Sequence, residues 1–316
     1  MLYIAYDNTA MTDGAGGQIQ RILSIYLIAR HYGIAYVHQG IQSLSYQGSS
    51  CLEKNKEDPE QIGKYNNLFN LPSHQYTKFD EMYKVYDISE EIIRKFSNND
   101  KNVLLLIQHA GTYIDAHPER ILDGIDFPWN SPWKYHADPT KGLVKVAIHV
   151  RRGELFVVDS TRMLPNSYYV ECMRALQQIL TEAKIKYEFH FYTEQLTKPT
   201  MVTPGHHGIC NRIKESVLVK PEDNHLEDFA EFGNTIVYHI NECPVQTLMD
   251  LTTADILLAS RSSFSYVAGM VKKEGVVLFH PFWHSLSPSW IPTKEGRDIL
   301  NAKETILRQL SAAIIP

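Results

Sequence analysis

The stretch Val144-Lys-Val-Ala-Ile-His-Val-Arg-Arg-Gly-Glu154 decides the fold of this chain. Its first seven residues, 144–150, are mostly apolar, which predicts a buried strand of a parallel sheet. Arg151 and Arg152 follow that strand directly. In open α/β sheets ligands bind outside the carboxyl ends of the strands, and guanidinium groups carry planar donors suited to phosphate oxygens. The stretch therefore predicts a site for an anion, most simply a nucleotide diphosphate, although an ordinary surface arginine pair fits it equally well.

Length and composition indicate a globular protein of two domains. The chain has 316 residues, of which 44% are hydrophobic and 21% charged, and a domain usually holds about 100–200 residues. The net charge of −5 disfavours a nucleic-acid partner or an anionic membrane. The four cysteines lie far apart with no CxxC pair, which argues against a zinc or redox site and suits a reducing compartment.

We expect a cytoplasmic protein with no membrane anchor. No apolar run approaches the ~20 residues that a membrane helix needs. We also expect no secretory leader, because the chain enters a strand almost at once, at residues 2–6.

Strands and helices alternate along the chain. The spacing of apolar residues predicts strands at 2–6, 34–38, 103–107, 144–150, 187–193, 236–240, 256–259 and 276–280, and helices near 17–33, 87–97, 117–124, 168–183, 245–253, 262–273 and 302–314. Asn166 is expected to cap the helix that begins near residue 168. Strands separated by helices imply right-handed crossovers and parallel sheets.

Three prolines, Pro128, Pro132 and Pro139, mark a break in this pattern. We therefore predict two Rossmann-like α/β domains, residues 1–140 and 141–316, whose parallel sheets face one another across a cleft. Residues 40–75 are polar and irregular and receive no assignment.

A glycine-rich turn, Gly14–Gln18, leads from the first strand into the first helix. Glycines allow a close approach of the backbone to a ligand, and a helix N-terminus offers free N–H groups. The turn is not a dinucleotide fingerprint, because G-x-G-x-x-G requires glycine where Ile19 stands, and no phosphate-binding GxxxxGK[ST] loop occurs. A tight strand-to-helix turn remains the alternative.

Two further loops carry polar residues. Glu154 and Asp159 lie close in sequence to the arginines, where each makes either an ordinary ion pair or a general base. Ser262 and Ser263 follow the predicted strand at 256–259. Their hydroxyls suit capping of the next helix, and the same helix N-terminus suits a phosphate.

Taken together, these segments resemble the GDP-fucose-dependent fucosyltransferases of the α1,2/α1,6 superfamily. Gly14–Arg21 is similar to the G-x-G-N-Q turn, and His149–Glu154 matches H-x-R-R-G-D with Glu in place of Asp. Leu164–Tyr169 resembles L-P-x-x-Y-Y, Phe189–Glu194 corresponds to a strand that ends in acidic residues, and Ala254–Ser265 is similar to the final motif with S-S-F-S. The match is strongest across residues 143–280.

The resemblance implies a GT-B fold and an inverting, metal-independent transfer of L-fucose from GDP-fucose to a glycan hydroxyl, with no cofactor. No Asp-x-Asp occurs in the sequence to hold a metal against a diphosphate. Arg151 matches the family's phosphate-binding arginine. The full set of expected donor-binding residues is Gly16, Gly17, Gln18, His149, Arg151, Arg152, Thr193, Glu194, Asp250, Ser262, Ser263 and Phe264.

The general base stays open. Asp159 lies at the offset at which the α1,6 branch carries its base, Glu154 is the rival, Asp13 is a third choice, and some inverting fucosyltransferases have no obvious base. Gly17 stands where the α1,2 enzymes have Asn.

Recognition of the guanine base is also open. Thr247 stands where the family often has an acidic residue, and Asp250, one helical turn on, is a substitute. Two alternatives therefore remain: an inverting GT-B transferase with another sugar nucleotide, and a non-catalytic nucleotide- or glycan-binding module.

Overall fold

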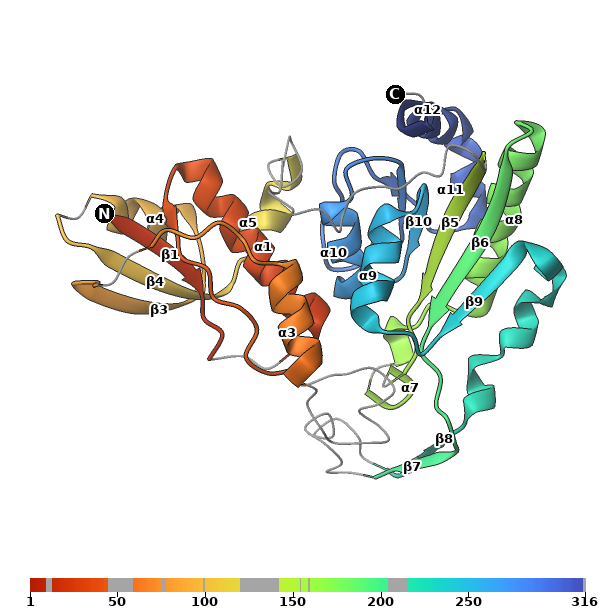
Figure 1. Ribbon diagram of the computed structural model, residues 1–316, viewed down its shortest axis with the longest axis horizontal. Helices are drawn as coiled ribbons and strands as arrows, with labels where there is room; N and C mark the ends of the chain where they lie inside the picture. Colours follow the sequence, from red (N-terminus) through yellow and green to blue (C-terminus); the bar gives the residue numbers. More distant parts are fainter. Residues whose placement is uncertain are drawn as a thin grey trace. The chain divides into compact units, whose positions relative to one another are not determined.

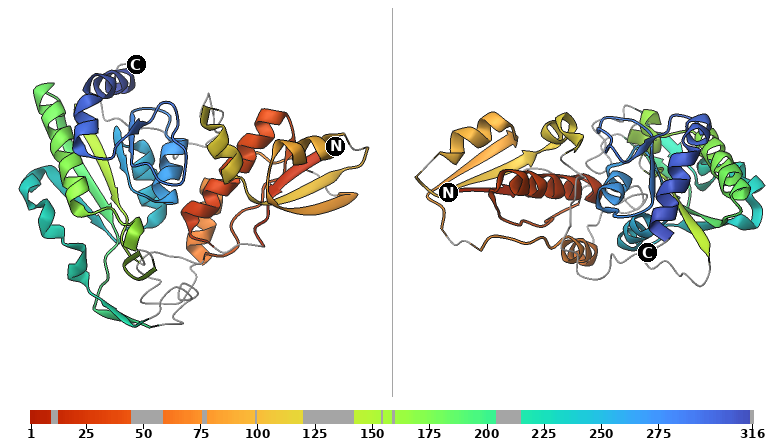
Figure 2. Two further views of the ribbon diagram at one scale, coloured as in Figure 1. Left: turned by 180° about the vertical axis from the view of Figure 1, so that it is seen from behind. Right: turned by 90° about the horizontal axis from the view of Figure 1, so that it is seen from above.

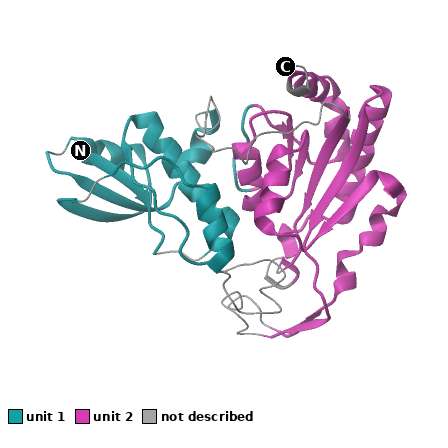
Figure 3. Cartoon of the chain, viewed as in Figure 1, with its two compact units in different colours: residues 1–45, 57–132, 283–288 teal, residues 46–56, 133–282, 289–316 magenta. Residues whose placement is uncertain are grey.

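The structure is a computed structural model, and it describes residues 1–9, 13–44, 59–75, 78–98, 100–119, 142–153, 155–158, 160–203 and 215–314. The chain divides into two compact units (Figure 3). Unit 1 comprises Met1–Ser45, Glu57–Pro132 and Trp283–Pro288, and unit 2 comprises Tyr46–Lys56, Trp133–Phe282 and Ser289–Pro316. The predicted boundary at residues 140 and 141 lies outside the described residues.

Unit 1 is built on a four-stranded parallel sheet with the order β2-β1-β4-β3 (Figure 1). Its elements are β1 (Leu2–Tyr6), α1 (Ala15–Tyr32), β2 (Ala35–Tyr36), α3 (Pro59–Leu68), β3 (Glu81–Asp87), α4 (Glu90–Ser97), β4 (Val103–His109) and α5 (Gly111–Ala116). From β1 the chain runs outward to β2, and it then crosses to the other side of β1 to form β3 and β4. The strand order therefore reverses between β1 and β4.

Helices α1 and α4 cover the same face of this sheet. Tyr6 of β1 donates a hydrogen bond to Gln18 of α1, and the Tyr83 ring of β3 lies 4.9 Å from Phe96 of α4. On the opposite face, Tyr3 packs against the rings of His74 and Phe79. The two crossovers β1–α1–β2 and β3–α4–β4 run in the same direction along the sheet, so right-handed connections require their helices to share a face.

Unit 2 contains a six-stranded parallel sheet with the order β12-β11-β10-β5-β6-β9, and a separate antiparallel pair, β7 and β8. Its strands are β5 (Leu143–Val150), β6 (Lys186–Thr193), β7 (Thr200–Val202), β8 (Val217–Val219), β9 (Ile236–Ile240), β10 (Ile256–Ala259), β11 (Val276–Phe279) and β12 (Ile291–Pro292). Its helices are α7 (Leu155–Val158), η1 (Ser160–Arg162), α8 (Asn166–Glu182), η3 (Pro221–Asn224), η4 (Leu226–Thr235), α9 (Pro244–Thr253), α10 (Ser263–Val271), α11 (Gly296–Asn301) and α12 (Lys303–Ile314).

The two faces of the larger sheet are covered by different helices (Figures 1 and 2). Helices α8, α11 and α12 cover the face that carries Val146, Ile148 and Phe189, and together they form the main apolar core. Helices α9 and α10 cover the other face. Side chains alternate between the faces of a strand, so His149 of β5 and Tyr192 of β6, which are register partners, lie on the α9 and α10 side.

The structure confirms the predicted α/β class with parallel sheets, and it corrects the sequence analysis at several elements. Strand β3 and the helices α3 and α5 were not anticipated. Asn166 is not the N-cap of α8, because Pro165 occupies that position and makes no side-chain cap. None of the described helices is both long and apolar enough to cross a membrane.

Candidate functional site

The sheet of unit 2 reverses its strand order between β5 and β10. From β5 the chain moves outward through β6 to β9, and it then returns to form β10 on the other side of β5. In open α/β sheets ligands bind outside the carboxyl ends of the strands at such a point. The predicted arginine loop follows β5 and the predicted serine loop follows β10, so the two loops flank this reversal.

Arg151 is held in place by the neighbouring strand. Its Nη1 donates to Oε2 of Glu194 at 2.8 Å, and the two side chains are 17% and 31% exposed. The register pairs Val150 with Thr193, which places the next residues, Arg151 and Glu194, side by side. Thr193 Oγ1 donates to the carbonyl of Val150 at 2.8 Å and ties the two strand ends together. Arg151 is therefore a partly exposed cation with a fixed orientation.

Arg152 occupies a different environment, although it is the next residue. It is buried, and it donates to the carbonyl of Arg151 at 2.9 Å and to Oδ1 of Asn166. Its guanidinium lies 5.9 Å from the centre of the Tyr169 ring, and burial lowers its pKa. Arg152 thus supports the backbone of Arg151 and the start of α8.

Asn166 extends this support to the chain that follows β8. Its Nδ2 donates to the carbonyls of Asn224 and His225 and to Oδ2 of Asp228, at 2.9–3.0 Å. This role of Asn166 was not predicted, because the only signal for it in the sequence is the L-P-x-x-Y-Y resemblance around this position.

His149 lies on the α10 side of β5. Its Nδ1 is 2.9 Å from Oγ of Ser260, and its ring centre is 5.6 Å from that of Phe264. Burial, and to a smaller extent the charge of Arg151, lowers the pKa of His149 to about 3. The imidazole is therefore neutral near pH 7, and it connects the end of β5 to the loop after β10.

The N-terminus of α10 is capped as the sequence suggested. Oγ of Ser262 accepts a hydrogen bond from the backbone N–H of Phe264 at 3.2 Å, and Ser263 is the first helical residue. Ser265 donates to the carbonyls of Ser260 and Ser262, which fixes the turn between β10 and the helix. Binding of an anion at this end of α10 stays a prediction.

Asp250 is occupied by its neighbours. Its carboxylate accepts hydrogen bonds from the Tyr192 hydroxyl at 3.2 Å and from Gln246 Nε2 at 3.0 Å, and it lies 3.8 Å from the ammonium of Lys145. These bonds leave fewer acceptor positions of the Asp250 carboxylate for a base. The candidate bases Glu154 and Asp159 lie outside the described residues.

Gly16, Gly17 and Gln18 belong to unit 1, at the start of α1. A Cβ at Gly17 would lie 2.5 Å from Oδ2 of Asp13, so an asparagine of the family motif does not fit here unless Asp13 moves. Gln18 donates to the carbonyls of Asp13 and Ser43, at 2.8 and 2.7 Å. Asp13 itself forms an ion pair with Arg21 at 2.8 Å. These side chains therefore hold the glycine-rich turn together.

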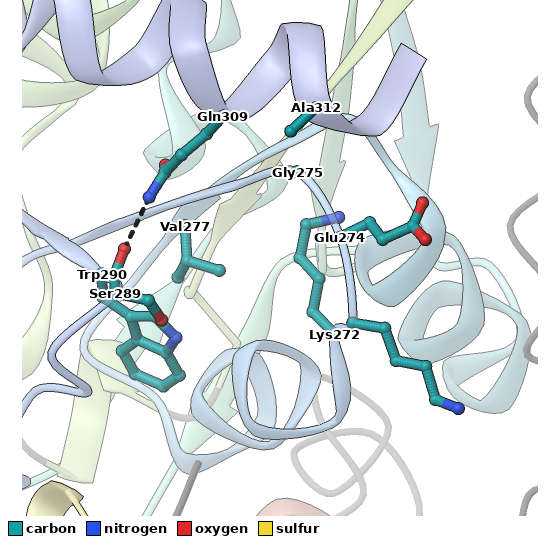
Figure 4. A pocket seen from close by; sticks show the side chains of 9 residues that line it. Lys272, Glu274, Gly275, Val277, Ser289, Trp290, Gln309 and Ala312 are labelled. Atoms are coloured by element: carbon teal, nitrogen blue, oxygen red, sulfur yellow. Dashed lines mark hydrogen bonds between the residues drawn. The ribbon is translucent and has the colours of Figure 1, made fainter. Parts of the chain in front are cut away.

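A surface pocket of about 250 Å³ lies elsewhere in unit 2 (Figure 4). It is lined by Lys272–Gly275, Val277, Ser289, Trp290, Gln309 and Ala312. Because Lys272–Gly275 precede β11, the pocket lies at the amino edge of the sheet, and none of the expected donor-binding residues lines it. Within the described ranges no cluster of three His, Cys, Asp or Glu side chains is placed to hold a metal ion.

No protein-family model and no curated protein matches the sequence. Among solved structures, the chain is similar to POFUT1 in complex with GDP, in two crystal structures, at 11% identity and a TM-score of 0.42, over 85% of this chain and 94% of that chain. It is also similar to E. coli heptosyltransferase WaaC with ADP-2-deoxy-2-fluoro heptose, at 9% identity and a TM-score of 0.39, over 99% of each chain.

Proposed function

We propose that this chain is a GT-B glycosyltransferase that transfers L-fucose from GDP-fucose to a glycan hydroxyl, with inversion and without a metal ion. The observation that carries the proposal is the position of Arg151. It follows β5 at the reversal of strand order, Glu194 fixes its guanidinium, and the capped N-terminus of α10 follows the adjacent strand β10. A fixed cation and a helix N-terminus beside one another suit a diphosphate.

In the proposed reaction an acceptor oxygen attacks the anomeric carbon of fucose. The new C–O bond forms on the face opposite to GDP while the bond to the β-phosphate oxygen breaks, and the acceptor proton passes to a base. Asp159 and Glu154 remain the candidates for that base. Negative charge grows on the leaving phosphate, and Arg151 stabilises it more in the transition state than in the ground state.

The other predicted residues have three roles in this proposal. Thr193, Glu194, Ser262, Ser263 and Phe264 border the nucleotide, and the glycine-rich turn of Gly16, Gly17 and Gln18 contributes from unit 1. His149 and Arg152 are positioning residues, because each is buried and bonded to the chain beside Arg151.

A second candidate donor has one observation in its favour. Asp250, the expected partner of guanine, already accepts hydrogen bonds from Tyr192 and Gln246. This arrangement favours an inverting transferase of the same type that uses another sugar nucleotide.

Calorimetric titration with GDP, UDP, ADP and their sugar nucleotides, in the presence of a chelator, tests the proposal. We expect GDP and GDP-fucose to bind without metal, and Arg151→Ala to weaken binding roughly tenfold to a hundredfold, the usual range for a hydrogen bond to a charged group. Arg174→Ala is the matched control, because Arg174 forms an exposed pair with Glu231 on another part of unit 2.

Each outcome has a defined meaning. A preference for UDP or ADP would keep a sugar-nucleotide transferase and discard fucose. If GDP-fucose binds but none of the glycan acceptors tested causes release of GDP, the result would favour the non-catalytic module. If no nucleotide binds, or if Arg174→Ala weakens binding as much as Arg151→Ala, the assignment of the donor site is wrong.

A further inference from the structure

The sheet of unit 1 has its own reversal of strand order, between β1 and β4, and polar side chains gather at its carboxyl edge. β1 ends at Tyr6, β4 at His109 and β3 at Asp87. Asp87 and His109 are register partners, and Arg21 of α1 is close enough to His109 to lower its pKa. We call Tyr6, Asp13, Arg21, Asp87 and His109 the unit 1 polar cluster.

Three atoms of this cluster are buried and have no hydrogen-bond partner in the described part of the chain. They are Nη1 of Arg21, Oδ1 of Asp87 and Nε2 of His109. Buried polar atoms in folded proteins almost always have a partner, either protein or ordered water. Three such atoms on neighbouring elements, at the edge where open sheets bind ligands, point to a polar ligand that supplies the missing bonds.

The chemistry of the three atoms defines the class of ligand. Arg21 can only donate, Asp87 as a carboxylate can only accept, and a neutral imidazole nitrogen can do either. Burial, followed by the charge of Arg21, lowers the pKa of His109, so the ring is neutral near pH 7.

Hydrogen-bonding capacity excludes the simpler alternatives. An anion that only accepts hydrogen bonds cannot satisfy Oδ1 of Asp87, and an ammonium ligand, which only donates, cannot satisfy Nη1 of Arg21. The charge of Arg21 is already balanced by Asp13 at 2.8 Å. Oδ2 of the neighbouring Asp7 is also buried without a hydrogen-bond partner, but it lies 3.3 Å from the ammonium of Lys84, which balances its charge. Adjacent neutral hydroxyl groups, which both donate and accept, satisfy all three atoms.

We propose that the unit 1 polar cluster binds a neutral polyhydroxyl ligand, a saccharide, through Arg21, Asp87 and His109. Binding of a saccharide here does not depend on the proposed function. Only the further step, that this saccharide is the acceptor, rests on it. Saccharide binding at this cluster and nucleotide binding beside Arg151 are separate measurements, so either can fail alone.

Saturation-transfer difference NMR on the full chain tests the site, with methyl glycosides of galactose, glucose, mannose and N-acetylglucosamine as probes. We expect at least one glycoside to bind, and His109→Phe and Asp87→Asn each to raise its dissociation constant roughly tenfold. His109→Phe keeps a ring of similar size and removes the nitrogens. His31→Phe is the matched control, because His31 is exposed on α1.

Two results would overturn the proposal. If no glycoside binds the folded chain, or if one binds equally well to His109→Phe and Asp87→Asn, then enclosed water fills the cluster and no ligand site exists there. Circular dichroism of each variant shows that it is folded. GDP binding in the same samples separates failure of this site from failure of the proposed function.

Discussion

At the scale of single residues, His149 sets a pH dependence of stability. Burial and the charge of Arg151 lower its folded-state pKa to about 3, whereas histidine in an unfolded chain titrates near ~6.5. Between these two values the unfolded chain binds a proton that the folded chain excludes. The contribution of His149 is therefore complete above ~6.5 and is lost as the pH falls toward 3, by up to ~1.4 kcal/mol per pH unit.

We expect the substitution His149→Asn to flatten this dependence. Urea unfolding of wild type and variant at several pH values between about 3 and 7 measures the slope. The variant is also expected to lose some stability at every pH, because the bond to Ser260 changes, but that loss does not affect the slope. His31→Asn, at an exposed position, is expected to keep the wild-type slope. Equal slopes in His149→Asn and wild type would show that His149 is not the group responsible.

Residue type and position in the sequence do not by themselves predict the environment of a side chain. Arg151 and Arg152 are identical in type and adjacent in sequence, yet one is partly exposed beside Glu194 and the other is buried beside Asn166. Their environments differ because the strand register places Arg151 beside Glu194. The unit 1 polar cluster could not be predicted, because its members come from β1, the α1 region, β3 and β4, and no spacing in the sequence connects them.

At the scale of elements, α10 combines a stability role with its proposed role at the phosphate. Ser262 caps α10, and Ser89 caps α4 of unit 1 in the same way, by accepting from the N–H of Ile92. Both Ser262→Ala and Ser89→Ala are expected to lower the free energy of unfolding by about 1 kcal/mol. Only Ser262→Ala is expected to weaken GDP binding, since only α10 follows β10.

Parallel measurements of urea unfolding and GDP titration check this prediction. Equal loss of stability in the two variants establishes that both caps were removed. If Ser262→Ala then binds GDP as tightly as Ser89→Ala, the Ser262 cap of α10 contributes structure and no phosphate contact.

Elements with a strong apolar signal were predictable, and edge elements were not. The sequence predicted β5, β6, β9 and β10 to within a residue or two, because their runs are continuously apolar or clearly alternating. β3 was missed because its sequence, EMYKVYD, does not alternate between apolar and polar residues, and because it lies at the edge of its sheet, where Met82, Tyr83 and Tyr86 are exposed. Only its pairing with β4 identifies it as a strand.

At the scale of the whole molecule, the two units share one design. Each has a parallel sheet whose strand order reverses once, and in each the polar residues of interest lie at the carboxyl edge beside that reversal. The chain passes between the units more than once. Trp283–Pro288 belongs to unit 1, although β11 before it and β12 after it belong to unit 2 (Figure 3).

The returning segment is held in unit 1 by specific bonds. His284 Nδ1 lies 3.1 Å from Nε2 of Gln20 in α1, and Ser285 donates to Asp115 of α5 through its backbone N–H and its hydroxyl, at 2.8 and 2.9 Å. The segment therefore joins α1 to α5. α1 also carries Arg21, and the glycine-rich turn lies at its start. The segment Trp283–Pro288 therefore helps to fix the position of α1 beside the carboxyl edge of the unit 1 sheet.

This arrangement predicts a local effect of a distant substitution. His284→Ala is expected to lower the opening free energy of α1 and α5 amides by about 1 kcal/mol, the usual value of one hydrogen bond, and to leave β5 and β6 unchanged. Native-state hydrogen exchange followed by mass spectrometry measures both regions in one experiment. His225→Ala, at an exposed position of unit 2 paired with Glu227, is expected to leave α1 and α5 unchanged. Faster exchange in β5 and β6 after His284→Ala would show that the segment stabilises unit 2, and unchanged exchange in α1 and α5 would show that its bonds to Gln20 and Asp115 hold nothing in place.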